Sequence, residues 1–168
     1  MKTILRHLSS FIAPIVVLIV LPWLILRGEG HTAARALAGA SAWKLAAGSI
    51  IAVAGLVLFI LSARMFILIG RGTIMPWDPT RHLITGSLYA YVRNPMILGV
   101  LVLLFGEALL FDSAGIALLA LFFFLVNTVY FHFSEEPGLE KRFGQEYAEY
   151  KQNVHMWIPR LKPWKPSR

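Results

Sequence analysis

Cysteine is absent from the chain, and charge is scarce: only 15% of the 168 residues are Asp, Glu, Lys or Arg. Without cysteine, the chain has no disulfide framework, no thiolate metal site and no cysteine nucleophile. The low charge argues against an ordinary soluble domain, in which about a quarter of the residues are charged. The length leaves room for one domain, residues 1–168, and for no separate soluble one.

Apolar residues make up 57% of the chain and gather in long runs. A helix needs roughly 20 mostly apolar residues to cross the bilayer. The pattern therefore predicts an all-α integral membrane protein with four, or five, transmembrane helices. The four runs cover about residues 11–26, 45–69, 96–111 and 114–133. Only Asp112 and Ser113 part the last two runs, which predicts an antiparallel helical hairpin.

The basic residues are distributed unevenly about these runs. Lys2 and Arg6 precede the first run as in a signal peptide, but no clear cleavage site follows, so we expect a retained first helix. With four spans, 13 of the 16 Lys and Arg residues fall on one side. The positive-inside rule then predicts a multi-pass protein with both termini in the cytoplasm. The net charge of +7 indicates a basic rim facing anionic headgroups rather than a nucleic-acid site.

Two segments on that basic side, residues 70–95 and 134–160, hold most of the polar side chains. The first is broken by glycine and proline and predicts a structured loop. The second predicts an amphipathic helix that lies on the membrane surface or caps a cavity. Trp157 and Trp164 beyond it resemble an interfacial anchor. The helical face comprises Leu139, Phe143, Tyr147, Tyr150 and Val154.

Each polar group has a structural and a functional interpretation. The tyrosines and Arg93 before Pro95 are typical of a headgroup-level belt, and also of a binding loop at the start of a helix. Glu135 and Glu136 could simply begin a helix, with Ser134 as its cap.

Three further observations concern ionisable residues. Glu107 lies inside the third run, where an ionisable group is costly and normally has a partner in the bundle, so a structural and a pocket role stay equally open. His132, one helical turn before Glu136, is either a packed interfacial residue or a ligand. No spacing of His and acidic residues predicts a metal site.

Taken together, two stretches resemble the isoprenylcysteine carboxyl methyltransferases and the related phospholipid methyltransferases. The first stretch runs from Gly72 to Gly99 and the second from Glu135 to Pro159. The resemblance to this family implies a pocket for S-adenosylmethionine (SAM) at the cytoplasmic face and a lipophilic methyl acceptor. The compact size indicates a bacterial inner membrane as the location. The matching residues are Gly72, Thr73, Pro76, Pro79, Leu83, Tyr89, Tyr91, Arg93, Asn94, Pro95, Met96 and Gly99, then Glu135, Glu136, Leu139, Phe143, Gly144, Tyr147, Tyr150, Lys151, Val154, Ile158 and Pro159.

The resemblance also implies roles for single residues. Glu135 would hold the amine or ribose of SAM, and Arg93 would either pair with a carboxylate or brace Glu136. The implied catalytic residues are Arg93, Glu136 and His132. The implied cofactor-binding residues are Arg81, His82, Leu83, Ile84, Tyr89, Asn94, Pro95, Met96, Ile97 and Glu135.

The chain departs from the family pattern at three positions. Ile97 replaces a common tyrosine and Ser87 a common glycine, while Phe131 stands where prenylcysteine-methylating members have an arginine. Without that arginine the acceptor could be an amine, an alcohol or a thiol instead of a carboxylate, unless His132 or Arg142 compensates. Two alternatives remain, an NADPH-dependent isoprenoid or sterol-type reductase and a non-catalytic membrane scaffold. The oligomeric state is not predicted.

Overall fold

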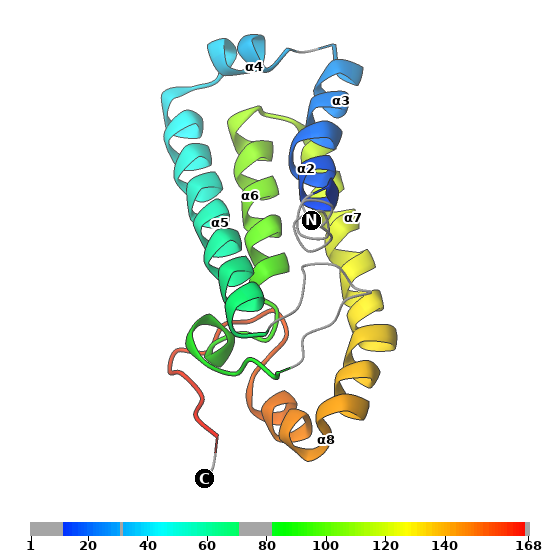
Figure 1. Ribbon diagram of the computed structural model, residues 1–168. Helices are drawn as coiled ribbons and strands as arrows, with labels where there is room; N and C mark the ends of the chain where they lie inside the picture. The colour runs from blue at the N-terminus through cyan, green and yellow to red at the C-terminus, as the bar shows by residue number, and fades with distance from the viewer. Residues whose placement is uncertain (1–11, 31, 71–81, 167–168) are drawn as a thin grey trace, which may run out of the picture.

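The structure is a computed structural model and describes residues 12–30, 32–70 and 82–166, all helical or loop with no strand among them. Figure 1 shows long helices side by side, with a loop and a shorter helix gathered at one end. In chain order the elements are α2 (Ile12–Ile15), η1 (Val16–Val20), α3 (Leu21–Gly28), α4 (Ala33–Gly39), α5 (Ala42–Leu68), η2 (Ser87–Ala90), α6 (Pro95–Leu110), α7 (Ala114–Tyr130), η3 (Phe131–Glu135) and α8 (Glu136–Asn153).

Two of these helical stretches are long and apolar enough to cross a membrane. They are Ala42–Leu68 and the rod of 40 residues from Ala114 to Asn153. A third span results if the bent pair Ile12–Gly28 and Ala33–Gly39 is one crossing. The 16 residues of α6 fall short of a span of about 17–25 residues. The protein is therefore an all-helical membrane protein, while four or five spans stay a prediction.

The helices α5 and α6 lie side by side and approach each other closely through glycines (Figure 1). A Cβ built on Gly55 would lie 2.3 Å from the backbone nitrogen of Leu103, and one on Gly99 would lie 2.6 Å from that of Phe59. Gly48 and Gly106 make equally close approaches. Small residues at helix interfaces let backbones touch, and packing then holds helices together without a hydrophobic driving force.

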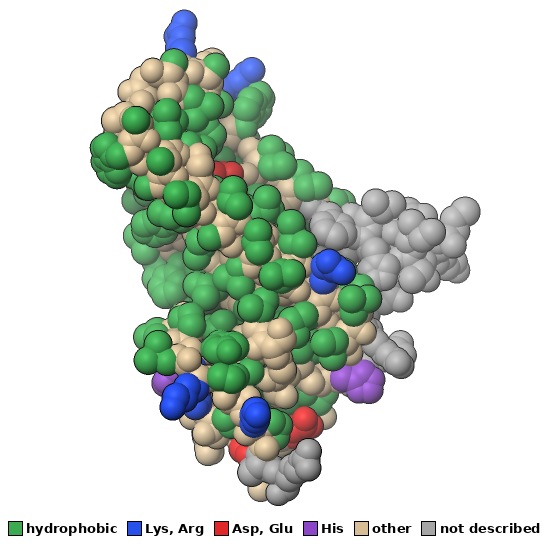
Figure 2. Space-filling view, turned by 90° about the vertical axis from the view of Figure 1, so that its left-hand side faces the viewer, with side chains coloured by type: hydrophobic (Ala, Val, Ile, Leu, Met, Phe, Trp, Pro, Cys, Tyr) green, Lys and Arg blue, Asp and Glu red, His purple; other side chains and the backbone are tan. Residues whose placement is uncertain are grey.

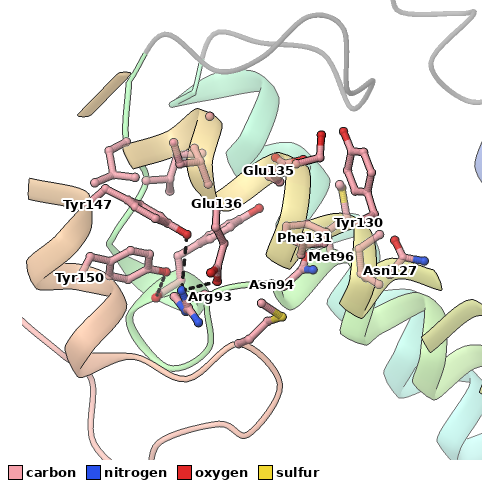
Figure 3. A pocket seen from close by; sticks show the side chains of 18 of the residues that line it. Arg93, Asn94, Met96, Asn127, Tyr130, Phe131, Glu135, Glu136, Tyr147 and Tyr150 are labelled. Carbon is pink, nitrogen blue, oxygen red and sulfur yellow. Dashed lines mark hydrogen bonds and ion pairs between the residues drawn. The ribbon is translucent and has the colours of Figure 1, made fainter. Parts of the chain in front are cut away.

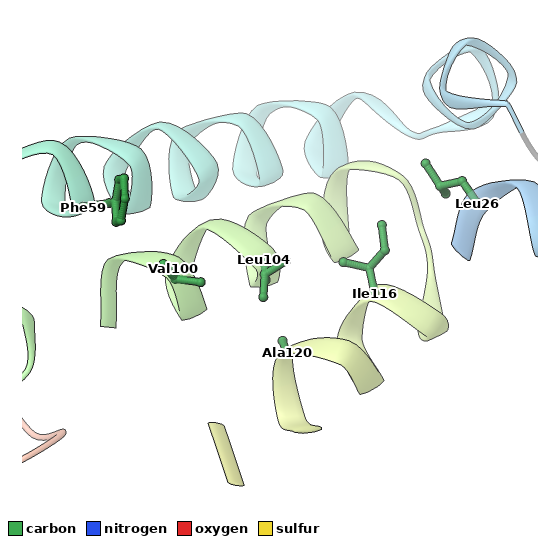
Figure 4. Packing of buried hydrophobic residues seen from close by; sticks show 6 residues of the cluster. All are labelled: Leu26, Phe59, Val100, Leu104, Ile116 and Ala120. Carbon is green, nitrogen blue, oxygen red and sulfur yellow. The ribbon is translucent and has the colours of Figure 1, made fainter. Parts of the chain in front are cut away.

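The hairpin predicted around Asp112 and Ser113 is present, and α3 closes over it. The Ser113 hydroxyl caps α7 by accepting from the Ile116 amide at 3.1 Å. Glu29, just after α3, accepts from the Ser113 hydroxyl at 2.8 Å and from the Gly115 amide at 2.9 Å. Next to this hairpin lies the apolar core, to which α3, α5, α6 and α7 contribute side chains (Figure 4). Its buried residues are Leu26, Phe59, Val100, Leu104, Ile116 and Ala120.

The fourth predicted run does not end at residue 133. A π-helical turn, η3, joins α7 to α8 without a break, so Glu135 and Glu136 lie inside a continuous rod. The prediction that they begin a helix capped by Ser134 was wrong, because no side-chain cap is present there. At a rise of 1.5 Å per residue the 40 residues from Ala114 to Asn153 have a summed helical length of roughly 60 Å, about twice the hydrocarbon thickness, and their direction changes at Gly144. The first half of the rod accounts for the span and α8 extends beyond it.

The predicted apolar face of α8 is confirmed. Tyr147, Tyr150 and Val154 are buried in one cluster, against which Leu139 and Phe143 pack. Within α8, Gly144 has φ +53°, a left-handed conformation that glycine adopts at little cost. The helix direction therefore changes there, and α8 curls beneath the bundle (Figure 1).

The C-terminal tail folds back onto the loop before α6. Amides of Arg93, Arg160 and Trp164 donate to backbone carbonyls of His155, Tyr91 and Ala90 at 2.8–2.9 Å. Trp164 is buried in the α8 cluster, and the Trp157 ring packs against Phe124 at 5.3 Å and Phe131 at 6.4 Å between centroids. The prediction of an interfacial anchor was wrong for Trp164, because its ring is buried in the protein, and it stays a prediction for the half-buried Trp157.

Candidate functional site

A cavity of about 360 Å³ lies between the loop before α6, the start of α6 and the rod α7–η3–α8 (Figure 3). Such a volume lies in the usual range of small-molecule sites, about 300–1,000 Å³. Five separate parts of the chain therefore meet at one site. The lining residues are Phe66 of α5; Leu83, Ile84, Tyr89, Arg93 and Asn94 of the loop; Met96 and Ile97 of α6; Asn127, Tyr130, Phe131, Ser134, Glu135, Glu136, Gly138, Leu139, Arg142, Tyr147 and Tyr150 of the rod; and Met156 of the tail.

Asn94 immediately precedes α6 and is a buried polar residue of the wall. Pro95 occupies the first turn of α6, where its missing N–H is no loss. Asn94 is only 5% exposed, and its Nδ2 has no hydrogen-bond partner among the described residues. A buried donor without a partner costs about 1–3 kcal/mol. In a pocket wall such a donor indicates a place where a ligand oxygen can accept a hydrogen bond.

Arg93 and Glu136 form a buried ion pair beside Asn94. The Nη1 of Arg93 lies 2.7 Å from Oε1 of Glu136, and Nζ of Lys151 lies 2.8 Å from Oε2. Both Glu136 oxygens therefore face protein cations, and Glu136 is only 3% exposed. Hydrogen bonds to Glu136 and then to Glu140 raise the pKa of Lys151 above its ordinary value. Of the two alternatives for Arg93, the structure has the brace to Glu136 (Figure 3).

Glu135 points to a different part of the cavity from Glu136 and is partly buried. Burial raises the pKa of its carboxyl, while the charge of Arg142 and a hydrogen bond from Tyr130 oppose that rise. Consecutive residues of a helix point about 100° apart, so Glu135 and Glu136 face different sides. Glu135 is thus a carboxylate that a cationic ligand group can reach.

Two tyrosines of α8 hold the loop before α6 in place. The Tyr150 hydroxyl donates to the backbone carbonyl of Tyr89 at 2.7 Å, and a Tyr147 hydroxyl lies 3.4 Å from Nη1 of Arg93. Burial, and then the charge of Glu135, raise the pKa of the Tyr89 hydroxyl. Burial raises the pKa of Tyr147 to about 12. Both hydroxyls therefore stay protonated near neutral pH.

The structure brings together nine of the residues singled out from sequence. His82 is exposed and does not line the cavity, Pro95 is buried in the helix turn behind it, and Arg81 lies outside the described residues. His132 is exposed, with its ring against Phe133 at 4.8 Å, and it does not line the cavity. The nine in the wall are Leu83, Ile84, Tyr89, Arg93, Asn94, Met96, Ile97, Glu135 and Glu136.

Other lining residues went unnoticed in the sequence. Asn127 lies in the last turns of α7, and its Nδ2 donates to the Phe123 carbonyl at 2.7 Å. An amide inside an apolar span is a signal that sequence reasoning could have used. Tyr130 carries no such signal, because tyrosine at a span end is common. Glu107, by contrast, does not line this cavity, and its Oε2 is buried without a partner in the described part of the chain.

Comparison with known proteins agrees with this arrangement. Residues 43–146 match the phospholipid methyltransferase family, and this range contains most of the cavity wall. A curated relative, methanethiol S-methyltransferase 1 of Bradyrhizobium diazoefficiens, is 38% identical over 78 residues, which are 45% of this chain and 25% of that protein. The match thus spans only a quarter of the relative's length. No solved structure matches the chain. The resemblance seen in the sequence is confirmed: the chain belongs to the phospholipid methyltransferase family of membrane proteins.

Proposed function

We propose that the chain is a SAM-dependent methyltransferase whose cavity binds SAM at the cytoplasmic membrane face. The unpartnered Nδ2 of buried Asn94 carries this proposal, and the Nε of Arg93 is likewise buried without a partner among the described residues. Unpartnered donors suit the carboxylate of a ligand. Glu135 suits its ammonium group or ribose hydroxyls. The donor set therefore fits an amino-acid-bearing nucleoside.

The residues of the chain position the ligand and exclude water. When bound, SAM supplies a methyl group already activated by its sulfonium. Tyr89, Leu83 and Ile84 offer a largely apolar wall for the adenosine part, and Tyr150 holds Tyr89 in place through its backbone. Catalysis then consists mainly of orientation and of desolvation of the acceptor. A thiol acceptor reacts as its thiolate, so it releases its proton to solvent before the methyl group is transferred to sulfur.

The acceptor that the cavity favours carries no carboxylate. Both lining cations already face carboxylates of the protein: Arg93 pairs with Glu136, and Arg142 lies near Glu135. Phe131, Met96 and Met156 form an apolar wall instead. An apolar thiol fits such a wall, and the curated relative is named for a thiol, methanethiol. We therefore place a small or lipophilic thiol first, ahead of an alcohol or amine.

Calorimetric titration of the detergent-solubilised protein with SAM tests the cofactor assignment. Loss of a hydrogen bond to a charged group costs about 1.5–3 kcal/mol, so Asn94→Ala should weaken SAM binding roughly 10- to 150-fold. Gln145→Ala, an amide truncation on the exposed side of α8, is the matched control and should bind as the wild type does. Unchanged affinity in Asn94→Ala would remove the basis for this site.

A second experiment addresses the acceptor. Purified protein is incubated with methyl-labelled SAM and, in separate reactions, with a thiol, an alcohol, an amine or a carboxylate. The four compounds carry the same apolar chain. The expected result is label transfer to the thiol and none to the carboxylate. Transfer to the carboxylate alone would contradict the assignment of the acceptor and leave the SAM site intact. Thermal stabilisation by NADPH but not by SAM would instead support the reductase alternative.

A further inference from the structure

Two large apolar side chains of the C-terminal tail lie fully on the surface. Leu161 is 100% exposed and Ile158 is 71% exposed, although the tail around them is packed against the protein. Leucine and isoleucine gain free energy when they leave water, so exposed side chains of this size are unfavourable. The two lie three residues apart in one tail segment, the turn of residues 155–164, and their exposure indicates a contact with something apolar.

The turn that carries them is held before Ile158, where the carbonyl of His155 accepts from the amide of Arg93 at 2.9 Å, and again on either side of Leu161. The amide of Arg160 donates to the carbonyl of Tyr91 at 2.8 Å, and the amide of Trp164 donates to that of Ala90 at 2.9 Å. The Arg160 guanidinium also donates to the backbone carbonyls of Asn153 and Lys162. Because the turn is already ordered, inserting its side chains elsewhere costs little further conformational entropy.

The turn also lies at the level where the apolar surface of the bundle ends. Its anchor residues, Ala90 and Tyr91, belong to the loop just before α6. Figure 2 shows hydrophobic side chains over the middle of this face and Lys, Arg and His side chains along its lower border. Lys162 and Lys165 of the tail are both exposed. Exposed apolar groups flanked by cations match the interface of a bilayer with anionic headgroups.

We propose that residues 158–165 form a second membrane contact, separate from the spanning helices. Ile158 and Leu161 enter the headgroup region, and Lys162 and Lys165 face the phosphates of anionic lipids. The partner is a lipid surface. The two lysines complement the negative charge of its headgroups, and the two apolar side chains match the boundary of its acyl chains. Through Ala90 and Tyr91 this contact is joined to the loop that forms one wall of the cavity.

Because the chain lacks cysteine, a single label can be placed at will. A Leu161→Cys variant carrying a fluorophore is reconstituted in nanodiscs that contain a nitroxide lipid labelled near the headgroup. A Gln145→Cys variant, labelled on the exposed surface of α8, is the control. We expect strong quenching at position 161 and weak quenching at position 145. Equal quenching at the two sites would overturn the proposal, as would quenching at 161 that appears only after a protein extract is added.

The role of the lysines is tested with two nitroxide lipids, one anionic and one zwitterionic, at equal mole fraction. Each lysine near the surface should enrich the anionic lipid about fivefold, so the anionic probe should quench the label at 161 more strongly. The excess should vanish in Lys162→Gln/Lys165→Gln and fall at high salt. No excess in the wild-type tail would exclude an anionic partner. An excess that survives both substitutions would show that residues other than Lys162 and Lys165 attract the anionic lipid.

Discussion

Substitution of Glu136 by glutamine tests whether this residue supports the site or takes part in the chemistry. The change keeps the shape and removes the charge that faces Arg93 at 2.7 Å and Lys151 at 2.8 Å. The side chains of Arg93 and Glu136 are 14% and 4% exposed, so water cannot replace the lost partner. Breaking such a buried pair costs about 3–5 kcal/mol. We expect a loss of that size in the free energy of unfolding.

The measurement is thermal unfolding in a mild detergent, followed by tryptophan fluorescence. For a chain of this length, 3–5 kcal/mol corresponds to a fall in Tm of roughly 6–20 °C. Lys151→Gln is the matched control: its side chain is 35% exposed, and a pair at that exposure contributes about 0–1 kcal/mol. The effect of Glu136→Gln should therefore exceed that of Lys151→Gln severalfold.

The opposite pattern would refute the reasoning. If Glu136→Gln unfolded at the wild-type temperature and lost only turnover, Glu136 would be a catalytic residue and not a support for Arg93. The double variant Arg93→Met/Glu136→Leu gives an independent check. It replaces the ion pair by apolar groups of similar size, which is often neutral or stabilising, so its Tm should recover above that of Glu136→Gln.

Three more predictions follow from other contacts. Gly55→Ala places a Cβ 2.3 Å from a backbone atom of Leu103 and should cost at least about 1–3 kcal/mol by thermal unfolding, whereas Gly39→Ala, with nothing within 4 Å, should cost nothing measurable. Glu29→Gln should lower stability by about 1 kcal/mol, because it weakens two hydrogen bonds to the start of α7; an unchanged Tm would show that the carboxylate contributes nothing. Because burial raises the pKa of Glu135, its carboxylate becomes neutral at a higher pH than that of an ordinary glutamate. The affinity for SAM measured by calorimetry should therefore fall on mild acidification. In Glu135→Gln the same affinity should not change with pH.

Periodicity and short connections were the reliable parts of the sequence reasoning. Tyr147, Tyr150 and Val154 recur at helical spacing and are buried together, because one helical face packs against one surface. The hairpin followed from the two residues between the apolar runs. Asn94 and Glu135 meet at one cavity, as the resemblance implied, although their roles toward SAM stay a prediction.

The errors came from features that depend on three-dimensional packing. Spacing placed His132 one turn before Glu136, but a π-turn lies between them and changes which way each side chain points. Trp164 has the sequence context of an interfacial anchor and is buried in the α8 cluster instead. The glycines of α5 and α6 read as ordinary members of apolar runs until the helices are seen in contact, as at Gly55.

The rod from Ala114 to Asn153 has a consequence for how the protein senses its surroundings. One wall of the cavity, with Glu135, continues directly from a membrane-crossing helix, whereas the opposite wall, with Asn94, begins a different helix. A helix adjusts to a thinner or thicker bilayer by changing its tilt. Such a change would alter the separation of the two walls, so we expect ligand affinity to depend on bilayer thickness.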